Sequence, residues 1–83
     1  MHQDYVIIKE FCLWSHIEPQ FVSDLAEMGI LHPMQIGGES CLSIPQVKEL
    51  QVYSRLYYEL SVNLEGIDVI RHLLKRLAVR RVQ

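Results

Sequence analysis

The sequence predicts a mostly α-helical domain with four helices and a short β-hairpin. Apolar residues fall at helical spacing in four stretches, and a Gly37-Gly38 pair separates two short extended stretches. Apolar residues make up 49% of the 83 residues and Gly and Pro are few, which favours a folded chain over a disordered one. A chain this short supports only one hydrophobic core, so we expect residues 1–83 to form a single domain.

Two short helices are expected in the first third of the chain. After an extended lead-in at residues 5–8, near-helical spacing predicts a helix of about two turns around Phe11, Cys12 and Trp14. Glu18-Pro19 is typical of a second helix start, because Pro fits the first helical position and a carboxylate meets the positive end of the helix dipole. Gly29 can adopt the left-handed conformation that commonly ends a helix.

A hairpin, or wing, is expected at about residues 31–42, followed by a C-terminal helical pair at about 44–81. Gly37-Gly38 can supply positive φ at both central positions of a tight turn. Ser43 and Gln46 match a capping box that would open the third helix. The residues expected to face the core from this helix are Val47, Leu50, Tyr53, Tyr57 and Leu60.

Asn63 is expected to cap a fourth helix with acids in its first turns and bases at its far end, which complements the helix dipole. Four apolar residues in this helix alternate by three and four: Ile67, Ile70, Leu74 and Leu77. That spacing could form a seam between two copies of the chain, but two heptads are few and packing within one chain explains them equally well.

The charge is distributed unevenly along the chain. Residues 1–43 carry one base against six acids, a net charge of −5, whereas residues 44–83 carry seven bases against four acids, a net charge of +3. The expected second helix has two acids and no base, and the wing adds Glu39 and no base. Since proteins that bind nucleic acid need positive charge where they meet phosphate, the residues indicate that nucleic acid is an improbable partner.

Several other functions are disfavoured by the sequence. Cys12, His16, His32 and Cys41 match no standard zinc spacing, and nothing near Cys12 would activate a nucleophile, so we expect no metal, no cofactor and no enzyme activity. Both cysteines are expected to be reduced and buried. No apolar run approaches the length that spans a bilayer, and no positive flank resembles a signal peptide, so the expected location is the cytoplasm.

The order of the elements, and several short stretches, resemble the winged-helix modules of the MerR type. The matching stretches are residues 8–12 (IKEFC), 17–19 (IEP), 28–33 (MGILHP), 42–43 (LS) and 60–67 (LSVNLEGI). Within that group the chain is most similar to the CbpM-type chaperone modulators, which are small cytoplasmic bacterial proteins. This closer resemblance depends on residues 10–12, on residues 57–68 (YYELSVNLEGID) and on the helix at residues 70–77 that follows.

The resemblance implies that the chain binds the J-domain of a DnaJ-like or CbpA-like co-chaperone and inhibits it. It also implies that an acidic face meets a positively charged helix of the J-domain. The partner-binding residues expected from this comparison are Glu18, Gln20, Phe21, Asp24, Glu27 and Glu39. Phe21 would be an apolar anchor if exposed, or would simply pack in the core, and Asp24 and Glu27 could be an ordinary solvated face. The alternative function is a DNA-binding regulator or excisionase of the MerR type.

Overall fold

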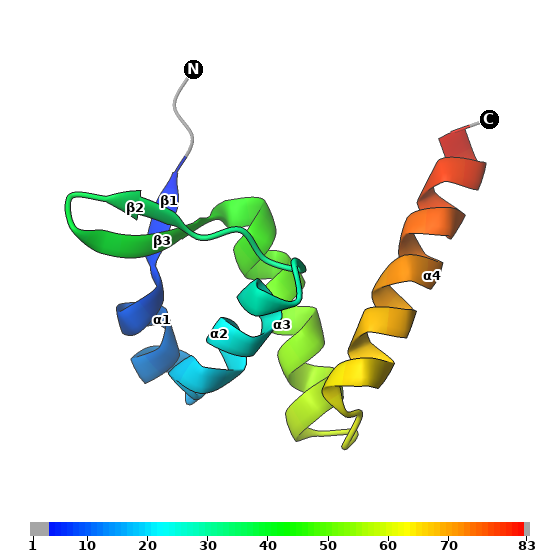
Figure 1. Cartoon of the computed structure of the whole chain (residues 1–83), viewed down its shortest axis with the longest axis horizontal. Helices are drawn as coiled ribbons and strands as arrows, with labels where there is room; N and C mark the ends of the chain where they lie inside the picture. Colours follow the sequence, from blue (N-terminus) through cyan, green and yellow to red (C-terminus); the bar gives the residue numbers. More distant parts are fainter. Residues whose placement is uncertain (1–3, 83) are drawn as a thin grey trace.

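The computed structural model describes residues 4–82, with side chains up to residue 78. The elements of this part follow one another as β1 (Tyr5–Ile7), α1 (Ile8–Ser15), α2 (Pro19–Glu27), β2 (Met34–Ile36), β3 (Glu39–Ser43), α3 (Ile44–Tyr58) and α4 (Leu64–Val82) (Figure 1). The predicted fold class, four helices with a hairpin wing, is confirmed. Among the described helices none is both long enough and apolar enough to cross a membrane.

The strands form a three-stranded antiparallel sheet in the order β1-β3-β2. Gly37 and Gly38 both have positive φ, at 57° and 83°, as a tight hairpin turn requires. The sheet has one strand more than the hairpin that the sequence predicts, because the extended lead-in pairs with β3 and places Tyr5 opposite Ser43. Pairing between segments so far apart leaves no local signal in the sequence.

The hydrophobic core joins all the helices to β3. Its fully buried large side chains are Leu25, Leu31, Leu42, Leu50 and Ile67. Burial of such a side chain contributes about 1.5–3 kcal/mol, so these five residues hold α2, β3, α3 and the start of α4 together. The expected inward positions Val47, Leu50 and Tyr53 of α3 are confirmed as buried.

Three residues that helical spacing placed on or near an inward face are exposed. Tyr57 is 39% exposed at the end of α3, and Leu60 lies beyond the last residue of that helix. Trp14 is 84% exposed, whereas Cys12 is buried. Residues two apart on a helix do not share a face, so burial of Cys12 turns Trp14 outward.

Ser43 is the N-cap of α3, as predicted, but the capping box is not formed. The Ser43 side chain makes no hydrogen bond to the backbone of α3, and the Gln46 side chain contacts the backbone of His32 and donates to the Ser43 hydroxyl at 3.3 Å. The His32 N–H donates to Gln46 Oε1 at 2.6 Å, and Gln46 Nε2 donates to the His32 carbonyl at 3.3 Å. Because Ser43 is also the last residue of β3, its backbone belongs to the sheet, and Gln46 ties the loop before β2 to α3.

The fourth helix begins as predicted. Asn63 Oδ1 accepts a hydrogen bond from the Gly66 N–H at 2.8 Å, which is the capping contact expected of Asn at this place. Ile67 enters the core, and the later turns of α4 run apart from the other elements (Figure 1). The side chains of Arg80 and Arg81, expected at the end of this helix, lie outside the described residues.

Candidate functional site

The outward face of α2 is the surface that a helix-turn-helix domain would present to its target. Phe21, Val22 and Leu25 are buried, whereas Gln20, Ser23 and Glu27 are exposed and Asp24 is half-buried. The outward residues recur every three or four positions and so share one stripe of the helix. Gln20 Nε2 donates to Asp24 Oδ1 at 2.9 Å along this stripe. The stripe therefore carries two carboxylates and no base.

Phe21 does not provide the exposed anchor considered for it. Its side chain is only 4% exposed and belongs to the core cluster. The ring centroid lies 4.6 Å from that of Tyr57 and 5.5 Å from that of Tyr58, with the Tyr58 contact edge to face. The core interpretation of Phe21 is therefore correct, because its ring is covered by two tyrosines that arrive from the end of α3.

A small pocket of about 120 Å³ lies where the start of α2 meets the end of α3. It is lined by Glu18, Gln20, Phe21, Asp24, Tyr57 and Tyr58. The Tyr58 hydroxyl accepts a hydrogen bond from the Glu18 N–H at 3.1 Å across this junction. Four residues expected at the partner site thus come together here, and the two tyrosines join them.

The two other expected site residues lie elsewhere. Glu27 is the last residue of α2, and Glu39 is the first residue of β3, directly after the Gly37-Gly38 turn. Neither lines the pocket. Both extend the acidic character of the surface, since β2, the turn and β3 contain no lysine or arginine.

The end of α1 exposes apolar side chains that sequence reasoning did not assign to a site. Within the part of the chain that the structure describes, Leu13 and Trp14 are the most exposed large apolar residues. Trp14 precedes Glu18 by four residues, so it belongs to the segment that leads into α2. Trp14 lies two residues after Cys12, which the sequence predicts to be buried, and this spacing is the signal that could have indicated that Trp14 is exposed.

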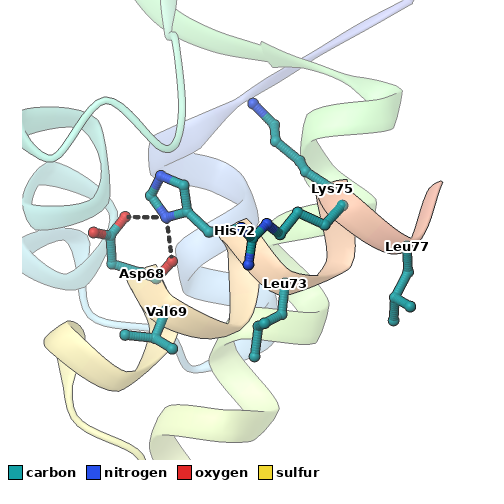
Figure 2. A pocket seen from close by; sticks show the side chains of 7 residues that line it. Asp68, Val69, His72, Leu73, Lys75 and Leu77 are labelled. Carbon is teal, nitrogen blue, oxygen red and sulfur yellow. Dashed lines mark hydrogen bonds and ion pairs between the residues drawn. The ribbon is translucent and has the colours of Figure 1, made fainter. Parts of the chain in front are cut away.

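The seam expected on α4 is only partly available to a partner. Ile67 is fully buried in the chain's own core and so is not accessible to a partner in the described conformation, and Ile70 is half-buried. Leu74 and Leu77 are exposed. Figure 2 shows Val69, Leu73 and Leu77 pointing to one side of α4, and His72 and Lys75 pointing to another. The hollow beside them is lined by α4 alone and is therefore an open flank of the helix.

His72 is held against its own helix. Its Nδ1 lies 2.7 Å from the Asp68 carbonyl oxygen and 3.7 Å from Asp68 Oδ1 (Figure 2). Arg71 Nη1 lies 3.9 Å from the same carboxylate oxygen. Asp68 is thus flanked by two potential cations of α4, which is an ordinary arrangement on a helix surface.

The cysteines are buried and unpaired. Burial raises the pKa of the Cys12 thiol, which disfavours the thiolate that a nucleophile or metal ligand requires. Within residues 4–82, no group of three or more His, Cys, Asp or Glu side chains is placed to hold a metal ion.

A family model described as MerR HTH family regulatory protein matches residues 6–81, which span all the helices and strands described above except the first residue of β1 and the last residue of α4. No significant match to the chain was found among curated proteins or among solved structures.

Proposed function

The chain belongs to the MerR HTH family of regulatory proteins, and from that premise we propose that it is a cytoplasmic, non-catalytic regulator that binds and inhibits the J-domain of a DnaJ-like co-chaperone. The observation that carries the proposal is the outward stripe of α2. This stripe presents Gln20, Asp24 and Glu27 where a DNA-reading member of the fold needs bases.

Electrostatics favours a basic polypeptide over DNA as the target. A helix that contacts duplex DNA gains affinity when lysine and arginine displace counterions from phosphate, and α2 and the hairpin have none to contribute. Asp24, Glu27 and Glu39 would instead repel the phosphates. The same carboxylates would speed encounter with a cationic helix and help to select it.

The J-domain is proposed because of the resemblance to the CbpM-type modulators, whose target presents a positively charged helix. In this proposal inhibition needs no chemistry, because a bound modulator covers the surface that the co-chaperone uses to engage its chaperone. Trp14 takes the place of Phe21 as the proposed apolar anchor, since an exposed tryptophan loses a large apolar area on docking and is often a binding hot spot.

The test is a titration of isotope-labelled protein with its cognate J-domain, followed by backbone amide shifts. We expect shifts concentrated on α1, α2 and the hairpin, and weaker binding by at least about tenfold for Trp14→Ala. Leu60→Ala is the matched control, because Leu60 is also exposed but lies after α3. Absence of shifts at high micromolar J-domain would contradict the proposal.

DNA binding is the second candidate, because membership of a helix-turn-helix regulatory family is equally consistent with it. The bases that could serve it, Lys75 and Arg76, lie on α4 rather than on α2. This candidate predicts retarded duplex DNA in a gel-shift experiment at low salt and steep loss of affinity as salt rises. No retardation at low salt would remove it.

Self-association through α4 is also proposed, with a second copy of the chain against Val69, Leu73 and Leu77. Antiparallel pairing centred on Leu73 would set Val69 of one copy against Leu77 of the other, so the exposed apolar side chains of the two helices would cover one another. Light scattering coupled to gel filtration should give a dimer that Leu73→Glu disrupts and Leu60→Glu leaves intact. A monomer at high concentration would exclude this arrangement.

A further inference from the structure

The pocket between α2 and α3 combines aromatic rings with carboxylates. Tyr57 and Tyr58 are 39% and 41% exposed, so each retains accessible ring surface above the buried Phe21. The three ring centroids lie between 4.6 and 5.5 Å from one another. A cation is attracted to an aromatic face within about 6 Å of its centroid, so a group seated among these rings would feel more than one of them.

The charged groups that line the pocket are all acidic. Glu18 and Asp24 are the titratable acids of its lining, and no lysine, arginine or histidine contributes to it. One Asp24 oxygen accepts the Gln20 amide, and Oδ2 makes no hydrogen bond to any described residue. The Glu18 carboxylate likewise has no hydrogen-bond partner or ion pair in the described part of the chain, although its backbone N–H binds Tyr58. Two carboxylates therefore remain available to a bound cation.

The helix ends at the pocket nearly balance each other. Tyr57 and Tyr58 are the last two residues of α3, whose carbonyl end carries partial negative charge. The first turn of α2 brings partial positive charge to the same place. The two carboxylates and the rings therefore decide which charge the pocket prefers in a bound group.

The size of the pocket limits what it can hold. Its volume of about 120 Å³ is well below the roughly 300–1,000 Å³ typical of small-molecule sites. The head of one side chain is a better match. A guanidinium is planar, stacks on aromatic faces and can at the same time donate to a carboxylate, whereas an ammonium is a strongly hydrated point charge.

We propose that this pocket is a receptor for one arginine side chain of a partner polypeptide, stacked on Tyr57 or Tyr58 and bonded to Asp24 or Glu18. This inference rests on the proposed function, which makes the partner a basic protein. It adds which side chain of that partner enters the pocket. Exposed aromatic area and carboxylates at one small pocket are the complement of a guanidinium.

The first experiment uses the whole chain and a minimal probe. Isotope-labelled protein is titrated to millimolar concentration with N-acetyl-arginine methylamide and, at matched ionic strength, with the citrulline counterpart, which has the same shape but no charge. We expect backbone amide shifts at Glu18, Phe21 and Tyr57 with arginine and not with citrulline. Equal shifts with both probes, or none with arginine, would overturn the proposal.

Matched variants test which groups act. Asp24→Asn keeps an acceptor for Gln20 and should weaken arginine binding by up to about fivefold, as expected for a partly exposed ion pair. Glu27→Gln removes a carboxylate of the same helix outside the pocket and should leave binding unchanged. Tyr57→Phe should bind normally, and Tyr57→Leu should bind weakly. Equal weakening by Asp24→Asn and Glu27→Gln would show a diffuse charge effect and would contradict a pocket.

A parallel titration with the J-domain separates this inference from the proposed function. Arginine binding at the pocket without J-domain binding would refute the proposed partner and support the pocket. J-domain binding that is unchanged in Asp24→Asn and Tyr57→Leu would refute the pocket as the receptor and leave the proposed function standing. A lysine probe that binds as tightly as the arginine probe would overturn the guanidinium preference.

Discussion

The Tyr58 hydroxyl accepts a hydrogen bond from the backbone N–H of Glu18 at 3.1 Å, and this contact fastens the end of α3 to the start of α2. The two residues are 40 positions apart in the sequence. Glu18 is the N-cap of α2, and its side chain makes no capping hydrogen bond. The entry of α2 is therefore held by a tyrosine from another helix, and that tyrosine also forms one wall of the pocket.

Removing this hydroxyl should loosen the junction without disturbing the rings. We expect Tyr58→Phe to lower the free energy of unfolding by about 0.5–1 kcal/mol, at the lower end for a hydrogen bond because the contact is exposed. Urea unfolding measures the change. Tyr57→Phe is the control, since the Tyr57 hydroxyl makes no hydrogen bond to any described residue. Equal effects of the two variants would contradict the role given to Tyr58.

Gln46 should hold the loop before the hairpin in place through His32. We expect Gln46→Ala to lower the free energy of unfolding by about 1 kcal/mol, because two hydrogen bonds to the His32 backbone and one to the Ser43 hydroxyl are lost to water. Amide hydrogen exchange at His32 should become faster than in the unmodified chain. Gln35→Ala removes a side-chain contact to Ser40 within the hairpin and should leave exchange at His32 unchanged.

Local sequence chemistry was enough to predict much of the fold. The Asn63 cap, the positive φ of Gly37 and Gly38, and Pro19 at the start of α2 each depend on residues close together in the chain, and the structure confirms them. The same applies to the acidic stripe of α2, because residues 20, 24 and 27 share a face by helical spacing alone.

The remaining features depend on contacts between distant segments. The lead-in pairs with β3, and Gln46 turns to His32, only after the chain has folded. Phe21 is buried because Tyr57 and Tyr58 cover it, so its exposure could not be read from α2 alone. The pocket was missed for that reason: its acids come from one helix and its exposed rings from another.

Gly66 is expected to resist replacement although alanine is the better helix former. A Cβ built on Gly66 would lie 2.8 Å from Val62 Cγ1 and 3.1 Å from Asn63 Oδ1, so it would displace the side chain that caps α4. We expect Gly66→Ala to lower the free energy of unfolding by about 1 kcal/mol, similar to Asn63→Ala, which deletes the cap itself. Thermal unfolding of both variants tests this.

Both substitutions at the start of α4 act on the same cap, so their effects should not add. The double variant, Asn63→Ala with Gly66→Ala, should be less destabilised than the sum of the single variants. A stabilising effect of Gly66→Ala would mean that Val62 and Asn63 yield without cost and that helix propensity decides the outcome.

Because of Tyr53, the stability of the fold should vary with pH in the alkaline range. Burial, followed by the charge of Glu49 and the hydrogen bond that the Tyr53 hydroxyl donates to Glu49 Oε2 at 3.1 Å, raises the pKa of Tyr53 to about 12, and Arg71 partly opposes this. The folded state thus holds the phenol proton more tightly than the unfolded chain. The stability that this tighter proton binding contributes is complete below the ordinary tyrosine pKa near 10 and is lost as pH rises through about 12.

The expected loss across that range is about 1–3 kcal/mol, since each unit of pKa difference corresponds to about 1.4 kcal/mol. Urea unfolding of the unmodified chain and of Tyr53→Phe at about pH 9 and about pH 11 measures it, because phenylalanine keeps the buried ring and cannot titrate. The stability of the unmodified chain relative to the variant should fall between the two pH values. A constant difference would mean that the Tyr53 phenol ionises as readily in the folded chain as in the unfolded one, and that Glu49 exerts no effect on it.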